Sequence, residues 1–252
     1  MSSAPVSEAV QAFAQLTRNR KSKVKSSSRE WQYLSAMLQD HQALFEQSQL
    51  SQNISRQLKV TLKNSSTSVT TILSLGLGSL QVTREQTRRL KQLTILLSLR
   101  DTLRQVSGKQ IGIYAQDPTF TRTDETFLNS LGISILRTPS GSDLGEAAAI
   151  ICPSTLIYSP FLTLEAYEQL LFNAATPVQF FVGDDFNALL KKWPKHSAER
   201  AQVERVMKSG LSRYRRRAVD GEGFWKEQDG TFPMAVYGWV DGGERRREKA
   251  KI

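Results

Sequence analysis

Two glycines spaced two residues apart mark the segment of this chain that is best suited to bind a ligand. A short apolar run at 71–75, typical of a buried strand, ends at Gly76-Leu-Gly-Ser79, and a helix-prone segment follows. In α/β proteins a strand, a tight turn and a helix N-terminus in this order often bind phosphates, nucleotides or other anions. The side chain of Ser79 and the free amides of the turn would be the hydrogen-bond donors. The predicted ligand residues of this glycine turn are Gly76, Leu77, Gly78 and Ser79.

The glycine turn matches part of the dinucleotide-binding fingerprint. Gly76 and Gly78 fit its first two glycines, but Gln81 stands where the third glycine would allow close packing of helix on strand. A second interpretation therefore stays open, in which both glycines simply permit a tight turn from strand to helix.

An acidic residue, Asp117, follows the second predicted strand, where doubly wound proteins often place a carboxylate on a ribose hydroxyl. It lies 41 residues after Gly76, about twice the usual interval, because the intervening helix is long. Asp-Pro also commonly opens a turn, in which the carboxylate accepts hydrogen bonds from local amides. Residue chemistry alone favours the turn, and Asp117 is kept as a predicted ligand residue.

Polar residues also close the fourth and fifth predicted strands. Tyr158 and Ser159 end the fourth strand at the carboxyl edge of the sheet, which is the ligand side of open α/β folds, so both join the predicted site. Asp184 and Asp185 follow the fifth strand and reach the same crevice in one interpretation. In the other, which we favour, Asp184 caps the helix that begins there.

The sequence contains no recognisable catalytic or metal-binding constellation. The two histidines, His41 and His196, have no His, Cys or carboxylate neighbours at metal-ligand spacing. A nucleophile elbow of the form G-x-S-x-G and a Walker lysine are both absent from the sequence. We therefore assign no catalytic residue and no metal ligand. No cofactor is required by the sequence, and an adenosyl-type ligand is compatible with the glycine turn.

Short apolar runs alternate with helical segments through the middle of the chain, which indicates parallel strands joined by right-handed crossovers. We predict an α/β, Rossmann-like fold: a mostly parallel sheet of five to six strands with helices on both faces, plus an N-terminal helical extension. The predicted strands of the middle are 69–75, 110–115, 133–136, 155–158 and 178–182. The predicted helices are 84–106, 122–131, 143–149, 163–174, 184–192 and 197–209, with glycine caps at Gly108 and Gly132.

The net charge of +10 is unevenly distributed over the 252 residues. Lys and Arg outnumber Asp and Glu by 9 to 4 in 1–64 and by 14 to 9 in 193–252, but the counts are 11 and 11 in 65–192. A neutral middle argues against a core that holds nucleic acid along its face, whereas the basic flanks can contact an anionic partner.

Composition divides the chain into five segments. They are a flexible basic arm (1–28), an N-terminal helical segment (29–64), the α/β core (65–192), a C-terminal helix and edge-strand extension packed on the core (193–240) and a disordered charged tail (241–252). Within the extension, residues 231–240 are predicted as a strand at a sheet edge because of Pro233. The basic cluster at 213–217 is interpreted as solvated charge or a nuclear-targeting segment.

Composition also bounds the compartment. No run approaches the ~20 apolar residues of a membrane span, and the N-terminal sequence lacks the pattern of a secretory signal. Cys152 is the single cysteine of the sequence, which excludes an intramolecular disulfide. We expect a cytoplasmic or nuclear protein that is not associated with a membrane.

Four motifs occur in order through the middle of the chain. They are Ser74-Leu-Gly-Leu-Gly-Ser79, the leucine series from Gln92 to Leu99, Asp117-Pro-Thr-Phe120 with Phe127-Leu-Asn-Ser-Leu-Gly132, and Thr155-Leu-Ile-Tyr-Ser-Pro160 with Tyr167, Leu170, Leu171 and Asn173. Together they resemble the SRR1-like domain, a family named for a plant regulator of light signalling and the circadian clock. The resemblance covers roughly residues 68–190 and implies a Rossmann-like sheet and a regulatory role, with no established chemistry. The basic flanks and the extension with Trp239 resemble those of fungal members.

One departure from the family pattern bears on function. After Pro160 the family usually has histidine and cysteine, where this chain has Phe161 and Leu162. We therefore expect a regulatory protein that acts by binding protein partners, with the glycine turn as the place for any small ligand. The alternatives are a nucleotide- or S-adenosylmethionine-dependent enzyme of Rossmann-like fold, and a nucleic-acid-associated protein that uses its basic flanks.

Overall fold

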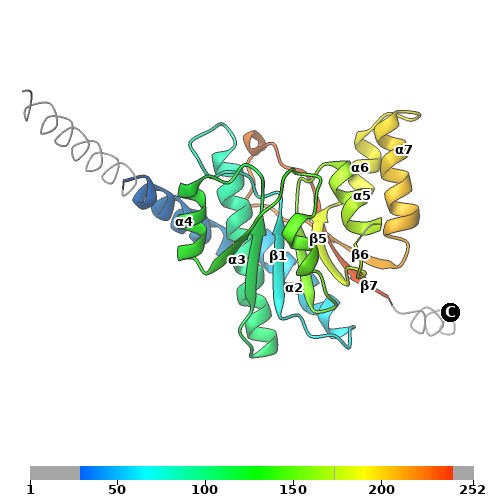
Figure 1. Ribbon diagram of the computed structural model, residues 1–252, viewed down its shortest axis with the longest axis horizontal. Coiled ribbons are helices and arrows are strands. Elements are labelled where there is room, and N and C mark those ends of the chain that lie inside the picture. Colours follow the sequence, from blue (N-terminus) through cyan, green and yellow to red (C-terminus); the bar gives the residue numbers. More distant parts are fainter. Residues whose placement is uncertain (1–28, 173, 241–252) are drawn as a thin grey trace, which may run out of the picture.

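The structure is a computed structural model that describes residues 29–172 and 174–240 (Figure 1). The described chain forms one seven-stranded sheet in the order β3-β2-β1-β4-β5-β7-β6. The predicted arm (1–28) and tail (241–252) lie outside the described residues. The strands are β1 (Thr71–Leu75), β2 (Gly112–Gln116), β3 (Ile133–Leu136), β4 (Thr155–Ser159), β5 (Phe180–Asp184), β6 (Tyr214–Val219) and β7 (Met234–Trp239).

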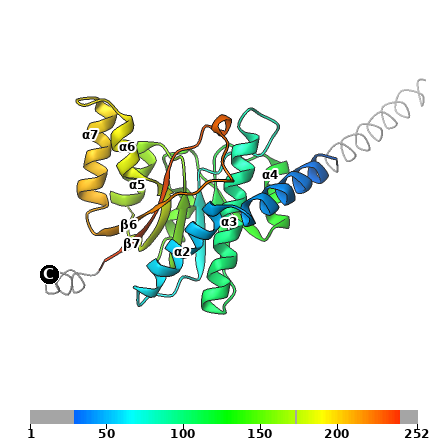
Figure 2. The same cartoon turned by 180° about the vertical axis from the view of Figure 1, so that it is seen from behind.

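Helices cover both faces of the sheet, as the alternating sequence predicts (Figures 1 and 2). The N-terminal helix, whose described part is residues 29–46, shares one apolar layer with α2, α3 and α4, and α5 to α7 share the layer on the opposite face. The labelled helices are α2 (Gln49–Lys63), α3 (Gln86–Ser107), α4 (Arg122–Ser130), α5 (Leu164–Phe172), α6 (Phe186–Lys192) and α7 (Ala198–Arg205). Three short helical turns are η1 (Gly145–Ala149), η2 (Val206–Gly210) and η3 (Glu227–Asp229).

The parallel part of the sheet has the doubly wound order and creates a switch point. β1 pairs in parallel with β2 on one side and with β4 on the other, while β3 and β5 lie outside these two strands. The connection after β1 leads to α3 on one face, and the connection after β4 leads to α5 on the other. Where consecutive connections diverge in this way, the carboxyl ends of the strands border a crevice that commonly binds ligands.

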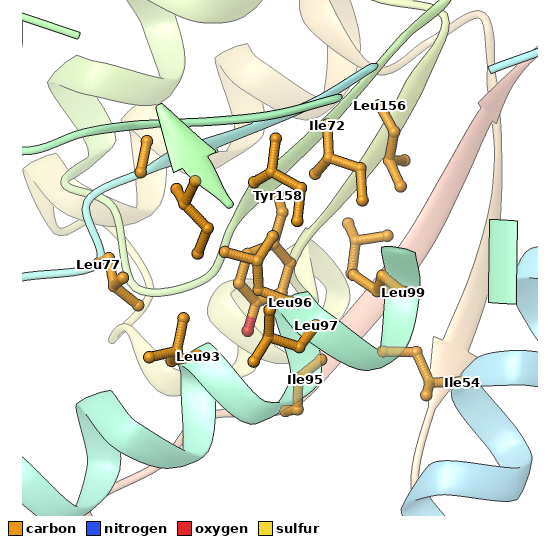
Figure 3. Packing of buried hydrophobic residues seen from close by; sticks show 14 of the residues in the cluster. Ile54, Ile72, Leu77, Leu93, Ile95, Leu96, Leu97, Leu99, Leu156 and Tyr158 are labelled. Atoms are coloured by element: carbon orange, nitrogen blue, oxygen red, sulfur yellow. The ribbon is translucent and has the colours of Figure 1, made fainter. Parts of the chain in front are cut away.

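Helix α3 packs on the sheet beside α2. Its leucines pack on Ile72, Leu156 and Tyr158 of the sheet, and Ile54 of α2 belongs to the same cluster (Figure 3). Helix α2 also lies against the sheet, since a Cβ on Gly238 of β7 would lie 2.5 Å from Thr61 of α2. The helix ends at Gly108, whose φ of 66° is left-handed, so the predicted glycine cap is confirmed. None of the described helices, α3 included, has the length and apolar character needed to cross a membrane.

The C-terminal extension differs from its prediction. The basic cluster at 213–217 forms most of β6, and the predicted edge strand, β7, lies inside the sheet between β5 and β6. Pro233 directly precedes β7. Because it lies outside the strand, its lack of an N–H removes no hydrogen bond between strands, and it does not force β7 to the sheet edge. β6 takes the edge, a place where basic side chains are common, and Arg216 pairs with Asp185 (Nε–Oδ1 2.6 Å). The sheet therefore has seven strands instead of five to six.

A buried ion pair fastens this extension to α3. The Nζ of Lys91 donates to Oδ2 of Asp229 and to the carbonyl oxygen of Phe224, both at 2.6 Å. The side chains of Lys91 and Asp229 are 1% and 3% exposed. The ammonium also lies 5.2 Å from the centroid of the Phe224 ring, within range of a cation–π interaction. Removal of either partner would leave an uncompensated buried charge.

We expect Lys91→Met to lower the free energy of unfolding by about 3–5 kcal/mol, the usual cost of breaking a buried ion pair from one side. Urea denaturation measures this change. The matched control is Lys109→Met at an exposed position just beyond α3, where the change should stay within about 0.5 kcal/mol. A loss below about 1 kcal/mol for Lys91→Met would contradict the anchoring role of the pair.

Candidate functional site

The switch point carries a cavity of about 280 Å³. Its walls come from the segments that follow β1, β2, β3 and β4 and from the first turn of α3. The charged residues of the lining are Arg88, Arg89, Asp117 and Asp143. The predicted crevice beside the glycine turn is thus open, and its size suits a small ligand.

The two glycines of the turn are required by backbone conformation and by neighbouring side chains. Gly76 and Gly78 have φ values of 74° and 76°, in the left-handed region that glycine enters without strain. A Cβ on Gly76 would lie 2.6 Å from Leu162 Cδ2, and one on Gly78 would lie 2.5 Å from Arg89 Nε. Side chains of the protein itself, Leu162 and Arg89, therefore lie close to the Cα atoms of the two glycines.

Three of the four amides of the turn are paired within the protein, and the first, Gly76 N–H, donates to the carbonyl of Gln116 at 3.2 Å. Gly78 N–H donates to Oδ2 of Asp117 at 2.8 Å, and Ser79 N–H donates to Oγ1 of Thr119 at 3.1 Å. Asp117 opens a turn, as one of its two interpretations predicts, by accepting from Thr119 N–H at 2.8 Å. It also lines the cavity, and its role as a ligand residue stays a prediction. An anion at this edge has to be bound chiefly by other groups.

Asp124 accepts further hydrogen bonds from the end of the turn, and the sequence analysis did not identify this residue. This carboxylate, 1% exposed, accepts from Leu80 N–H at 2.8 Å and from the Ser79 hydroxyl at 2.7 Å. It also accepts from the backbone N–H and the hydroxyl of Thr121, the N-cap of α4. The sequence signal was a capping box, Thr-x-x-Asp, which predicts the local cap but cannot show that the same carboxylate reaches the turn after β1.

Asp117 lines the cavity, and the hydrogen bonds of its carboxylate leave one acceptor position unused. Its Oδ1 accepts from both the N–H and the hydroxyl of Thr119, and its Oδ2 accepts from Gly78 N–H. An ionised carboxylate has about four lone-pair sites, so these three bonds leave one for a hydroxyl of a ligand. Of the seven predicted ligand residues, four line the cavity: Gly76, Leu77, Gly78 and Asp117.

The other three predicted ligand residues lie outside the cavity lining. Tyr158 is fully buried beneath α3, where its hydroxyl donates to the carbonyl of Gln92 at 2.9 Å (Figure 3). Burial raises the pKa of its phenol well above the ordinary value. Ser159 is also fully buried, and its carbonyl accepts from Tyr167 at 2.7 Å. Ser79 is buried against Asp124, since its hydroxyl belongs to the pairing of the turn.

Phe161 forms a wall of the cavity in a strained conformation. Its φ of 67° is left-handed, which is uncommon for a residue with a bulky side chain. Its N–H donates to Oδ1 of Asp184 at 3.1 Å, and Tyr167 donates to Oδ2 of the same carboxylate at 2.9 Å. Burial raises the pKa of Asp184 to about 6. The cap of α6 is instead Asp185, so the capping role predicted for Asp184 is wrong by one residue.

The described residues hold no cluster of three or more His, Cys, Asp or Glu side chains that could bind a metal ion. What the site offers is a half-enclosed cavity with two carboxylates, two guanidinium groups and an aromatic wall. Such groups bind and orient a small polar ligand by hydrogen bonding and charge.

Comparisons with known proteins give one family and several distant folds. A family model described as the SRR1 domain matches residues 35–228, which extends beyond the resemblance at 68–190 into the N-terminal helix and η3. A comparison with curated protein sequences found no match.

Among solved structures, fibrillarin of Aeropyrum pernix, in complex with natively bound S-adenosyl-L-methionine, is similar at 12% identity and a TM-score of 0.42, covering 74% of this chain and 76% of that one. The fibrillarin pre-rRNA processing protein of Methanococcus jannaschii shows 17% identity and a TM-score of 0.39, covering 69% and 67%. Cofactor-bound Rv0187 from MTB shows 11% identity and a TM-score of 0.40, covering 83% and 90%. At these values the function of this chain has to be argued from its own residues.

We expect Asp124→Ala to destabilise the protein by about 2–4 kcal/mol, because the buried N–H of Leu80 loses a charged acceptor and α4 loses half of its capping box. Urea denaturation gives the loss, and hydrogen exchange of the Leu80 amide locates it. Asp101→Ala is the control, since its carboxylate is about half exposed and makes surface ion pairs of little worth. Equal stability of the two variants would contradict the role given to Asp124.

The raised pKa of Asp184 predicts a pH dependence of stability. The folded state holds this proton up to about pH 6, whereas the unfolded chain releases it near the ordinary value of 3.8. The contribution of Asp184 to the free energy of unfolding should therefore fall by about 3 kcal/mol as the pH rises from about 4 to about 6, and stay level above that. Asp184→Asn removes this component, so the difference between wild type and variant should follow the same curve. A difference that is constant with pH would refute the assignment.

Proposed function

The chain belongs to the SRR1 domain family, and from this premise we propose that it is a regulatory protein whose cavity binds a small hydroxyl-bearing ligand of nucleoside type. The family membership rests on a match over residues 35–228. The regulatory role and the action through protein partners are parts of this proposal that the family resemblance suggests. The cytoplasmic or nuclear location is a part that the composition of the sequence suggests.

The observation that carries the ligand proposal is the spare acceptor of Asp117. This carboxylate stands directly after β2, at the carboxyl edge of the sheet and beside the switch point between β1 and β4. A carboxylate in that place accepts hydrogen bonds from ribose hydroxyls in doubly wound proteins. Here it is held by Gly78 and Thr119, so that a ligand would meet an oriented acceptor.

The lining of the cavity favours binding over a reaction that needs a nucleophile or a proton relay. Its ionisable side chains are two arginines and two aspartates. Arginine stays protonated at all ordinary pH values, and Asp143 is bound to Gly145 N–H at 2.7 Å. The positions at which the family usually has histidine and cysteine hold Phe161 and Leu162, which add an apolar wall. Transfer of a methyl group from S-adenosylmethionine is the alternative, because that chemistry makes few demands on the side chains around the cofactor.

Isothermal titration with adenosine, 2′-deoxyadenosine and S-adenosylmethionine tests the proposal. We expect adenosine to bind more tightly than the 2′-deoxy compound, and Asp117→Asn to weaken adenosine binding by about 10–100-fold, since hydrogen bonds to charged groups contribute about 1.5–3 kcal/mol. Asp101→Asn, on the exposed side of α3, is the control and should leave the affinity unchanged.

Two outcomes would contradict the proposal. If none of the three compounds binds at millimolar concentration, the cavity is not a nucleoside site. If the protein binds S-adenosylmethionine and passes its methyl group to an acceptor added from a cell extract, with S-adenosylhomocysteine as the product, the regulatory interpretation is replaced by the enzymatic one.

A further inference from the structure

Arg88 is the charged residue of the cavity lining with the largest number of unused donors. A guanidinium has five N–H donors. In Arg88 one terminal nitrogen pairs with Oε1 of Glu85 at 2.8 Å, at a place where the Glu85 side chain is 45% exposed. The Nε of Arg88 is buried and has no hydrogen-bond partner among the described residues. A buried donor without an acceptor is costly, and the donors of the terminal nitrogens that Glu85 does not use are the ones left for a ligand.

The neighbouring arginine of the lining, Arg89, already donates hydrogen bonds to other groups of the protein. Arg89 donates to the carbonyl of Ser79 at 2.7 Å and to Glu85 at 2.6 Å, and its side chain lies over Gly78. The amides of Gly76, Gly78 and Ser79 in the glycine turn donate to the protein's own oxygens. Arg88 is therefore the charged side chain of the lining with the most donors left for an anionic group that enters the cavity.

The Arg88 guanidinium also lies over an aromatic ring. Its central carbon is 5.4 Å from the centroid of the Phe161 ring, a cation–π contact. The N–H of Phe161 in turn donates to Oδ1 of Asp184 at 3.1 Å. A guanidinium can bind a carboxylate or phosphate through two parallel N–H donors.

We propose that Arg88 binds an anionic group of the ligand, so that the cavity takes a nucleoside that carries a phosphate or a carboxylate. This inference rests on the proposed nucleoside site and adds the chemical class of its ligand. The glycine turn in the sequence predicts an anion bound by backbone amides. In the present proposal a side chain of α3 binds it instead. In this arrangement Asp117 accepts from the ribose and Arg88 donates to the anion.

Two matched pairs of compounds test this assignment by isothermal titration of the full chain. Adenosine and AMP differ by a phosphate, and 5′-methylthioadenosine and S-adenosylhomocysteine differ by an amino-acid group with its carboxylate. We expect the anionic member of at least one pair to bind about tenfold or more tightly than its partner, which corresponds to about 1.4 kcal/mol. Arg88→Met should abolish that advantage, so that the two members of the pair bind this variant with equal affinity. The pair that shows the advantage identifies the anion as phosphate or carboxylate.

The control variant is Arg84→Met, which removes an exposed arginine of the same region that is not part of the cavity lining. It should retain the advantage of the anionic compound, which excludes a general effect of net charge. Urea denaturation of Arg88→Met shows that the variant is folded before its binding is measured. If the neutral compounds bind and neither anionic compound binds more tightly, or if Arg88→Met keeps the advantage, the role of Arg88 is wrong and the nucleoside site stands. If none of the four compounds binds, the nucleoside site itself is wrong and the role of Arg88 falls with it.

Discussion

The rim of the candidate site depends on the need to pair the N–H groups that follow β1. Gly76 N–H still donates to the carbonyl of Gln116 in β2 at 3.2 Å, but the amides of Gly78, Ser79 and Leu80 have no strand partner, and leaving such groups unpaired in the interior would be costly. Two carboxylates from the next βα connection meet this need, because Asp117 accepts from Gly78 and Asp124 accepts from Leu80. The connections after β1 and β2 are thereby joined into one rigid rim beside the cavity.

This pairing changes what the cavity can bind. A glycine turn with free amides attracts anions, but here the protein's own carboxylates occupy that place. The remaining acceptor on Asp117 and the remaining donors on Arg88 lie on different elements of the lining. A ligand with both hydroxyl groups and an anionic group matches this separation better than a free phosphate ion does.

The C-terminal extension is part of the fold and not an addition to it. β7 inserts between β5 and β6, and the buried pair of Lys91 and Asp229 attaches the segment between β6 and β7 to α3. The match of the SRR1 domain to residues 35–228 includes Lys91 and ends one residue before Asp229. A basic residue on the buried part of α3 thus serves the packing of a segment that lies more than a hundred residues further along the chain.

The sequence by itself determined the fold class, the parallel strands up to β5 and the position of the glycine turn. These depend on local patterns: apolar runs, helical periodicity and glycine caps such as Gly108, which act over a few residues. The tertiary structure alone decided that β6 is a strand at the edge, because its arginines hide the alternation that would reveal it. It also decided which polar groups are free to bind a ligand. Asp124 accepts a hydrogen bond from Leu80 N–H, 44 residues away, and the Tyr158 hydroxyl donates to the carbonyl of Gln92 in α3. A side chain's availability depends on partners distant in sequence, and a local pattern cannot specify them.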